Sequence, residues 1–169
     1  MQISGSDRFG AKPAMSALAL EGTVGGLLSA AALALWFFVT DTLAGQPFHT
    51  PALLGARLFG GPASASGSIV GLVAGYTLFH GLAFIVAGLM VAWAVALFER
   101  TPPLMIPGTF FLVVFFEFVY YTYVLAFVEP VLGAVNWPAV LVGNFLAGAS
   151  MIGYFWRRHP DLLRRLARD

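Results

Sequence analysis

Four long apolar runs, separated by short polar segments, dominate the pattern of hydrophobic and polar positions. They cover about residues 16–39, 69–98, 104–128 and 139–156. A helix needs about 17–25 mostly apolar residues to cross the hydrocarbon core of a bilayer, and each run is long enough. The runs are continuous and do not alternate in polarity, which excludes the strands of a membrane β-barrel. The pattern predicts an all-α, four-helix transmembrane bundle, forming a single domain over residues 1–169.

The segment 41–68, between the first two runs, predicts one additional short helix. Thr50 followed by Pro51 is typical of a helix start, and Gly-Gly-Pro at 60–62 is typical of a helix end. The residues between them, 52–59, are too few to span a membrane. We therefore expect a short helix in or against the outer membrane interface.

Composition agrees with the hydropathy pattern and excludes several classes of protein. Hydrophobic residues make up 59% of the chain and charged residues only 10%, whereas soluble domains average about 25% charged. A soluble enzyme, a nucleic-acid-binding domain and a disordered regulator are all disfavoured. The chain has no cysteine, which excludes disulfides, thiolate metal sites and cysteine nucleophiles.

The few basic residues are distributed asymmetrically. Eight of the nine flank the ends of the spans that share one side of the membrane, and Arg57 alone lies on the other. The eight are Arg8, Lys12, Arg100, Arg157, Arg158, Arg164, Arg165 and Arg168. By the positive-inside rule, both termini are expected in the cytoplasm. We expect a multi-pass protein of the bacterial inner membrane.

The C-terminal tail, 157–169, combines leucines with arginines. Its basic residues are Arg157, Arg158, Arg164, Arg165 and Arg168. Such a segment can form a surface helix attracted to anionic lipid, or it can act as a flank that fixes topology. Both interpretations make the bilayer, including anionic lipids, a partner.

Small residues recur at helical spacing in three of the runs. The candidate helix-packing residues are Gly22, Gly26, Gly67, Gly71, Gly75, Gly143 and Ala147. Rows of small residues allow the backbones of membrane helices to approach closely. They indicate packing within one four-helix bundle, or else an oligomer seam or a pore lining.

The third run has a different character, because aromatic residues fill it after Gly108. A helix with so much aromatic bulk cannot pack closely around its whole circumference. At least one face is expected to meet lipid, a lipid-like ligand such as a quinone, or a partner subunit.

Several polar residues occur inside the runs, and they are the best candidates for function. A carboxylate at Glu117 is costly in a membrane unless it is protonated, paired or reached by water. Counted along the helices, His80, Asn144 and Ser29 fall near its depth. The candidate cluster is His80, Glu117, Asn144, Tyr76, Tyr120, Tyr121 and Ser29. It predicts either a structural hydrogen-bonded lock or a proton-accepting or ligand-orienting site.

Two ion pairs are expected nearer the ends of the spans. Glu21 is expected to pair with Arg157 or Arg100 at the cytoplasmic rim, and Asp41 with Arg57 in the outer loop. The His and carboxylate residues are too few and too dispersed for a bis-histidine haem or a di-metal bundle. We predict no metal and no cofactor, although a quinone or a lipid is possible.

Without a catalytic constellation, we do not expect enzymatic activity. The leading hypothesis is a non-catalytic subunit or accessory protein of a larger membrane assembly, bound to other membrane subunits or to itself. One alternative is an oligomeric channel or proton-linked transporter that uses the His/Glu/Asn cluster. Another is a quinone- or lipid-binding component of a membrane enzyme. No motif assigns the chain to a known family.

Overall fold

The computed structural model describes residues 15–59, 68–123 and 137–160, and all secondary structure in these ranges is helical. The elements are α1 (Met15–Leu43), α2 (His49–Leu58), α3 (Ile69–Arg100), the short 3-10 helix η1 (Pro102–Leu104), α4 (Met105–Tyr123) and α5 (Trp137–Arg158). Within this part of the chain, α1, α3, α4 and α5 are long and apolar enough to cross a membrane. The predicted all-helical fold with four candidate spans is confirmed.

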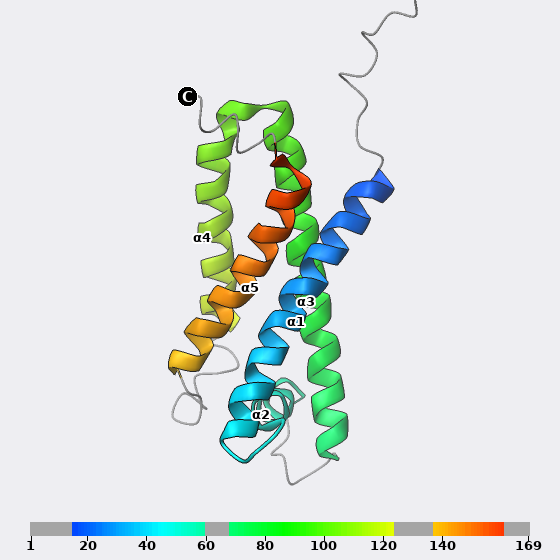
Figure 1. Ribbon diagram of the computed structural model, residues 1–169, viewed down its shortest axis with the longest axis vertical. Coiled ribbons are helices and arrows are strands. Elements are labelled where there is room, and N and C mark those ends of the chain that lie inside the picture. The colour runs from blue at the N-terminus through cyan, green and yellow to red at the C-terminus, as the bar shows by residue number, and fades with distance from the viewer. Residues whose placement is uncertain (1–14, 60–67, 124–136, 161–169) are drawn as a thin grey trace, which may run out of the picture.

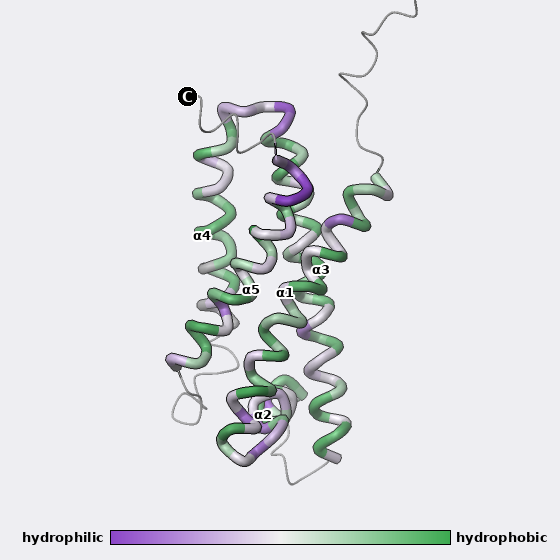
Figure 2. The backbone as a smooth tube through the Cα atoms, in the orientation of Figure 1, coloured by the Kyte–Doolittle hydropathy of each residue, from purple (hydrophilic) through white to green (hydrophobic). Residues whose placement is uncertain are grey.

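The four long helices run up and down along the longest axis of the molecule (Figure 1). The start of α1, the η1 turn and the end of α5 lie at one end, which we call the η1 end. The short helix α2 lies at the opposite end, which we call the α2 end. The most hydrophilic segments gather at these two ends (Figure 2).

The helices α1, α3 and α5 extend beyond their apolar runs, and α1 and α3 are the longest. At about 1.5 Å per residue, the 29 residues of α1 measure roughly 43 Å and the 32 residues of α3 roughly 48 Å. The helix α1 continues past the predicted end at residue 39, and the hydroxyl of Thr42 donates to the Phe38 carbonyl oxygen at 2.6 Å. The chain turns only at Gly45, which has a φ of 74°. Backbone conformation rather than polarity therefore ends this helix.

The glycines of α1 allow α3 to approach its backbone. A Cβ atom added to Gly22 would lie 2.6 Å from the Cα of Leu89, and one added to Gly26 would collide with the carbonyl oxygen of Phe84. From the other side, a Cβ on Gly88 would collide with the carbonyl oxygen of Gly22. Because the two backbones are in direct contact here, dispersion and close packing hold α1 against α3.

A second face of α1 packs against α5. A Cβ atom on Gly143 would lie 2.5 Å from Leu33 Cδ1 and 2.9 Å from Trp36 Cδ1. The indole Nε1 of Trp36 donates a hydrogen bond of 2.7 Å to the Ala139 carbonyl oxygen. The helix α1 therefore lies between α3 and α5 and forms the centre of the bundle (Figure 1).

The other candidate packing residues occupy different environments. Ala147 is buried. A Cβ on Gly75 would lie 2.7 Å from the Phe59 ring, whereas Gly71 has only the Ser68 hydroxyl nearby. Gly67 lies outside the described residues.

The short helix predicted over residues 52–59 is present as α2, but it begins earlier, at His49. Its first turn is held by Asp41 of α1. The backbone N–H of Thr50 donates to Asp41 Oδ2 at 2.7 Å, and the Thr50 hydroxyl donates to Oδ1 at 2.8 Å. The helix then packs on the start of α3, where Gly55 meets the backbone of Leu72.

The helix α4 is attached to the bundle mainly through its turn. The ring of Phe98, at the end of α3, fills the space over Gly108. Beyond this hairpin, within the described part of the chain, α4 makes no extended contact with α1, α3 or α5. The predicted end of this span, residue 128, lies outside the described residues.

Candidate functional site

His80 lies on α3, where it faces α1. Its half-buried ring lies 5.6 Å from the ring of Tyr76 and 4.7 Å from that of Phe84. The side chain makes a hydrogen bond to the backbone of Ala30 on α1. The other ring nitrogen, Nε2, is buried and has no hydrogen-bond partner among the residues that the structure describes. It is a polar atom that can still accept or donate a hydrogen bond.

The remaining members of the candidate cluster lie in different environments. Ser29 is fully buried, and its hydroxyl donates to the Gly25 carbonyl oxygen at 3.0 Å. Asn144 is exposed, and none of the hydrogen bonds in the described part of the chain involves its side chain. Tyr76 and Tyr120 are half-buried. The side chains of Glu117 and Tyr121 lie outside the described residues, so a cluster centred on Glu117 stays a prediction.

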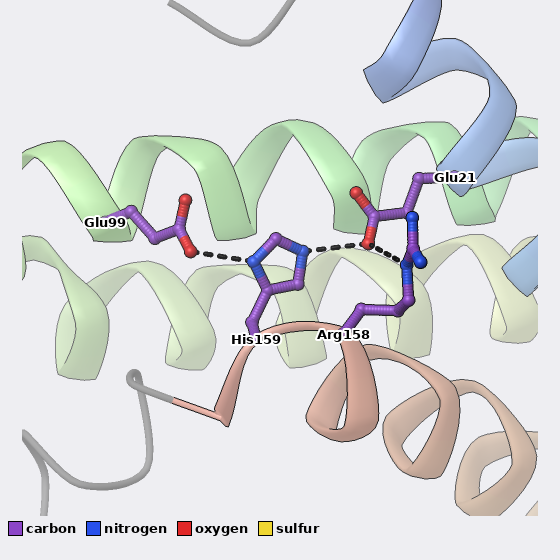
Figure 3. Close-up of polar contacts among 4 residues, drawn as sticks. All are labelled: Glu21, Glu99, Arg158 and His159. Atoms are coloured by element: carbon purple, nitrogen blue, oxygen red, sulfur yellow. Dashed lines mark hydrogen bonds and ion pairs between the residues drawn. The ribbon is translucent and has the colours of Figure 1, made fainter. Parts of the chain in front are cut away.

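A second group of polar residues lies at the η1 end, and it is held together by direct contacts. We call Glu21, Glu99, Arg158 and His159 the histidine–carboxylate cluster (Figure 3). His159 Nε2 lies 2.8 Å from Glu21 Oε1, and His159 Nδ1 lies 2.7 Å from Glu99 Oε1. Arg158 Nε lies 3.6 Å from the same oxygen of Glu21. The imidazole therefore bridges two carboxylates.

Three helices bring these side chains together. Glu21 lies near the start of α1, and Glu99 lies in the last turn of α3. His159 directly follows α5, and its backbone N–H donates to the Phe155 carbonyl oxygen at 2.9 Å, continuing the helical turn. One imidazole thus links the ends of α1, α3 and α5 on a single side of the molecule.

The cluster is only partly open to solvent. The side chains of Glu21 and His159 are 12% and 18% exposed, whereas those of Glu99 and Arg158 are 44% and 63% exposed. Partly buried charges are costly unless they are paired. A protonated His159 together with Arg158 would neutralise the two carboxylates.

The expected partner of Glu21 was in part wrong. We predicted Arg157 or Arg100, but the structure pairs Glu21 with Arg158 and His159. An α-helix turns by about 100° per residue, so Arg157 and Arg158 point in different directions. The sequence does offer a signal for His159, since it follows the fourth span at the same end as two glutamates.

The expected pair of Asp41 with Arg57 was also wrong. Both carboxylate oxygens of Asp41 bind Thr50, and Arg57 is exposed. No group of three or more His, Asp or Glu side chains among the described residues is arranged to hold a metal ion.

We compared the chain with protein families, with curated proteins and with solved structures, and none of the three comparisons gave a match. The functional argument therefore depends on the residues and their geometry.

Proposed function

We propose that this chain is a non-catalytic subunit or accessory protein of a larger membrane assembly, and that α4 is the surface that meets its partner. The observation that carries the proposal is the exposure of α4. None of the described residues in the apolar window within Pro102–Tyr120, which covers η1 and most of α4, is buried inside the molecule, whereas 33% of the corresponding window in α1 is buried.

The exposed residues of α4 are large, and they surround the helix. Phe110, Phe111 and Phe118 are 65%, 69% and 69% exposed. These three rings lie on one side of the helix, but Val113, which is 55% exposed, lies about 160° around the axis from Phe111, because successive helical residues are separated by about 100°. A single lipid-facing stripe would leave the opposite side of α4 packed on its own bundle. Here both sides are available, so one can face lipid while the other packs against another subunit.

The large side chains of α4 favour contact with a partner subunit over close packing of α4 against its own bundle. Membrane helices that approach closely do so through small residues, as α1 and α3 do at their glycines. Between Gly108 and Tyr123, α4 has no glycine or alanine. Its phenylalanines suit a looser interface in which aromatic rings fill grooves on a partner.

The test is the composition of the particle in mild detergent, extracted from its native membrane and measured by native mass spectrometry. We expect the chain together with different subunits. Phe111→Ala combined with Phe118→Ala, on one face of α4, should reduce the assembled fraction at least tenfold. Leu78→Ala combined with Leu82→Ala is the matched control on exposed positions of α3, which are 66% and 55% exposed. A monomer or a pure homo-oligomer from native membrane would contradict the proposal.

We further propose that the assembly resides in the bacterial inner membrane, with the η1 end facing the cytoplasm. The positive-inside rule supports this orientation, because Arg100, Arg157 and Arg158 all flank the η1 end. In the same orientation, α2 would lie at the outer interface, which its position at the opposite end of the molecule supports (Figure 1).

A second candidate function, a proton-linked transporter or channel, is favoured by one observation, the unpartnered Nε2 of His80. An imidazole nitrogen with a free hydrogen-bonding position between two membrane helices is suited to pass a proton or to orient a ligand. Proton flux into liposomes tests this candidate. Flux that is present in the wild type and lost in His80→Gln and Glu117→Gln would favour transport over the accessory role.

A further inference from the structure

The geometry of the histidine–carboxylate cluster limits which protonation states can make all of its contacts. A neutral imidazole has one N–H donor and one acceptor, and an ionised carboxylate only accepts. Both nitrogens of His159 lie within 2.8 Å of a carboxylate oxygen. If both carboxylates are ionised, both hydrogen bonds can form only when His159 is a protonated imidazolium. The alternative is a neutral imidazole with the proton on one of the carboxylates, which then donates to it. In both cases, the cluster holds one proton more than it would with a neutral His159 and with Glu21 and Glu99 both ionised.

We propose that the cluster is a proton-binding site that latches α1, α3 and α5 together at the η1 end and opens when this proton is lost. With the proton bound, His159 donates to Glu21 on α1 and to Glu99 on α3. When the proton leaves, one of these hydrogen bonds is lost, and a nitrogen lone pair faces a carboxylate. Histidine is the residue whose ordinary charge change falls between about pH 5 and pH 8.

Among the described residues, no other group lies within hydrogen-bond distance of Glu21 or Glu99 to replace the lost donor. The titratable groups that face it are Glu21 from α1 and Glu99 from α3, while η1 contributes no titratable side chain. On its own segment, Arg158 pairs with Glu21, and the ring of Phe155 lies 6.4 Å away. Among the described residues, Arg158 is the only arginine in an ion pair with the cluster. Within the part of the chain that the structure describes, loss of the proton thus leaves two carboxylates paired with one arginine.

Charge balance also favours the protonated latch. The protonated cluster has two negative and two positive charges, and the deprotonated one has a net charge of −1. Because Glu21 and His159 are mostly buried, this charge is poorly solvated. Glu99, the more exposed carboxylate, is the contact that we expect to open first.

The first test measures the melting temperature of the purified full chain in detergent at pH 6.0 and pH 8.5. We expect the wild type to melt about 2–4 °C lower at the higher pH, as suits the loss of one hydrogen bond. His159→Gln keeps one donor and one acceptor at every pH, so this difference should disappear. His49→Gln, an exposed histidine at the α2 end, is the control and should keep it. Equal pH dependence in wild type and His159→Gln would overturn the proposal.

The variant Glu99→Gln tests whether the additional proton, and not only the contact between His159 and residue 99, stabilises the cluster. The glutamine amide can donate to a neutral imidazole, while the remaining N–H of His159 donates to Glu21. This variant should therefore keep both contacts without the additional proton, and at pH 8.5 it should melt above the wild type. A variant that melts below the wild type at pH 8.5, or that keeps the full pH dependence, would show that His159 is only a structural link.

A distance measurement tests the opening directly, and it uses the wild-type cluster. The chain has no cysteine, so spin labels at Leu20→Cys on α1 and Ile152→Cys on α5 would be the only ones. Both positions are exposed, at 67% and 52%. Between pH 6.0 and pH 8.5, the distance distribution should broaden or lengthen, and it should not change when Glu99→Gln is added. If the distance distribution of the labelled protein with the wild-type cluster is the same at pH 6.0 and pH 8.5, the latch is contradicted. None of these outcomes depends on what α4 binds.

Discussion

At the scale of single residues, the few polar side chains near the ends of the spans act through short-range contacts with backbone or with one another. Asp41 is an example. It is 7% exposed, and it uses both carboxylate oxygens to hold the first turn of α2 through the backbone N–H and the hydroxyl of Thr50. The first N–H groups of a helix have no partner within the helix, so this carboxylate performs the role of an N-cap from a distant position.

Replacing Asp41 by alanine is expected to destabilise the α2 end. By comparison with measured N-caps, Asp41→Ala should cost about 1–2 kcal/mol, and hydrogen exchange over α2 should accelerate. The neighbouring change Thr42→Ala is the control, because the Thr42 hydroxyl only adds a bond to a carbonyl of its own helix. Equal exchange rates in Asp41→Ala and in the control would show that packing on α3, rather than Asp41, holds α2.

The partners of these polar residues were the least predictable part of the sequence. The scarcity of charge indicated correctly that Glu21 needs a cationic partner, but the choice between Arg157, Arg158 and His159 depends on the rotation of α5 about its axis. That rotation is set by contacts far along the helix, such as Gly143 against Leu33. For Asp41, charge complementarity in the sequence favours Arg57, whereas the path of the loop, which the sequence does not show, brings Thr50 to the carboxylate.

At the scale of elements, α1 is the helix that packs against both α3 and α5. It presents glycine to α3 on one side and to α5 on the other, where a Cβ on Gly25 would lie 3.0 Å from the Phe155 ring. In a membrane, lipid chains cover apolar helix surface as favourably as another helix does. Close packing of the helices therefore decides which ones associate. Of the glycines in the small-residue rows, Gly22 and Gly26 lie against the backbone of α3, and Gly143 lies against side chains of α1.

Adding one methyl group at the contact between α1 and α3 is expected to weaken the bundle. In Gly26→Ala, the Cβ would collide with the carbonyl oxygen of Phe84, and backbone cannot yield as a flexible side chain does. We expect a loss of about 1–3 kcal/mol, seen as a lower melting temperature in detergent. Gly81→Ala is the matched control, because a Cβ there has nothing within 4 Å. It should be neutral or up to about 1 kcal/mol stabilising. A Gly26→Ala protein as stable as the control would contradict direct backbone contact.

The existence of each spanning helix was predictable, whereas the helix ends and the placement of α4 were not. Apolar runs of this length have few alternatives in a membrane, but helices continue past the last apolar residue until a turn stops them, as α1 does until Gly45. The aromatic third run indicated that part of α4 would remain unpacked. That none of its apolar window would be buried depends on the hairpin at Phe98 and Gly108, which the hydropathy pattern does not encode.

At the scale of the whole molecule, the polar residues separate into two ends of different chemistry. The η1 end has the histidine–carboxylate cluster and the arginines that follow α3 and α5, and the α2 end has a capped short helix with a single arginine, Arg57. A membrane potential and an anionic cytoplasmic leaflet act on the two ends differently. The orientation in the membrane therefore decides whether the latch senses cytoplasmic or external pH.

The absence of cysteine makes this orientation directly measurable. His49 at the α2 end and Thr101 beside η1 are both exposed, and replacing either by cysteine removes no basic residue that sets the topology. In cells with a permeable outer envelope, a membrane-impermeant maleimide should label His49→Cys at once and Thr101→Cys only after the membrane is opened. The reverse pattern would place both termini outside and would make the latch a sensor of external pH. Labelling of both positions in closed cells would mean that the chain inserts in two orientations. The eight-to-one distribution of basic residues argues against that outcome.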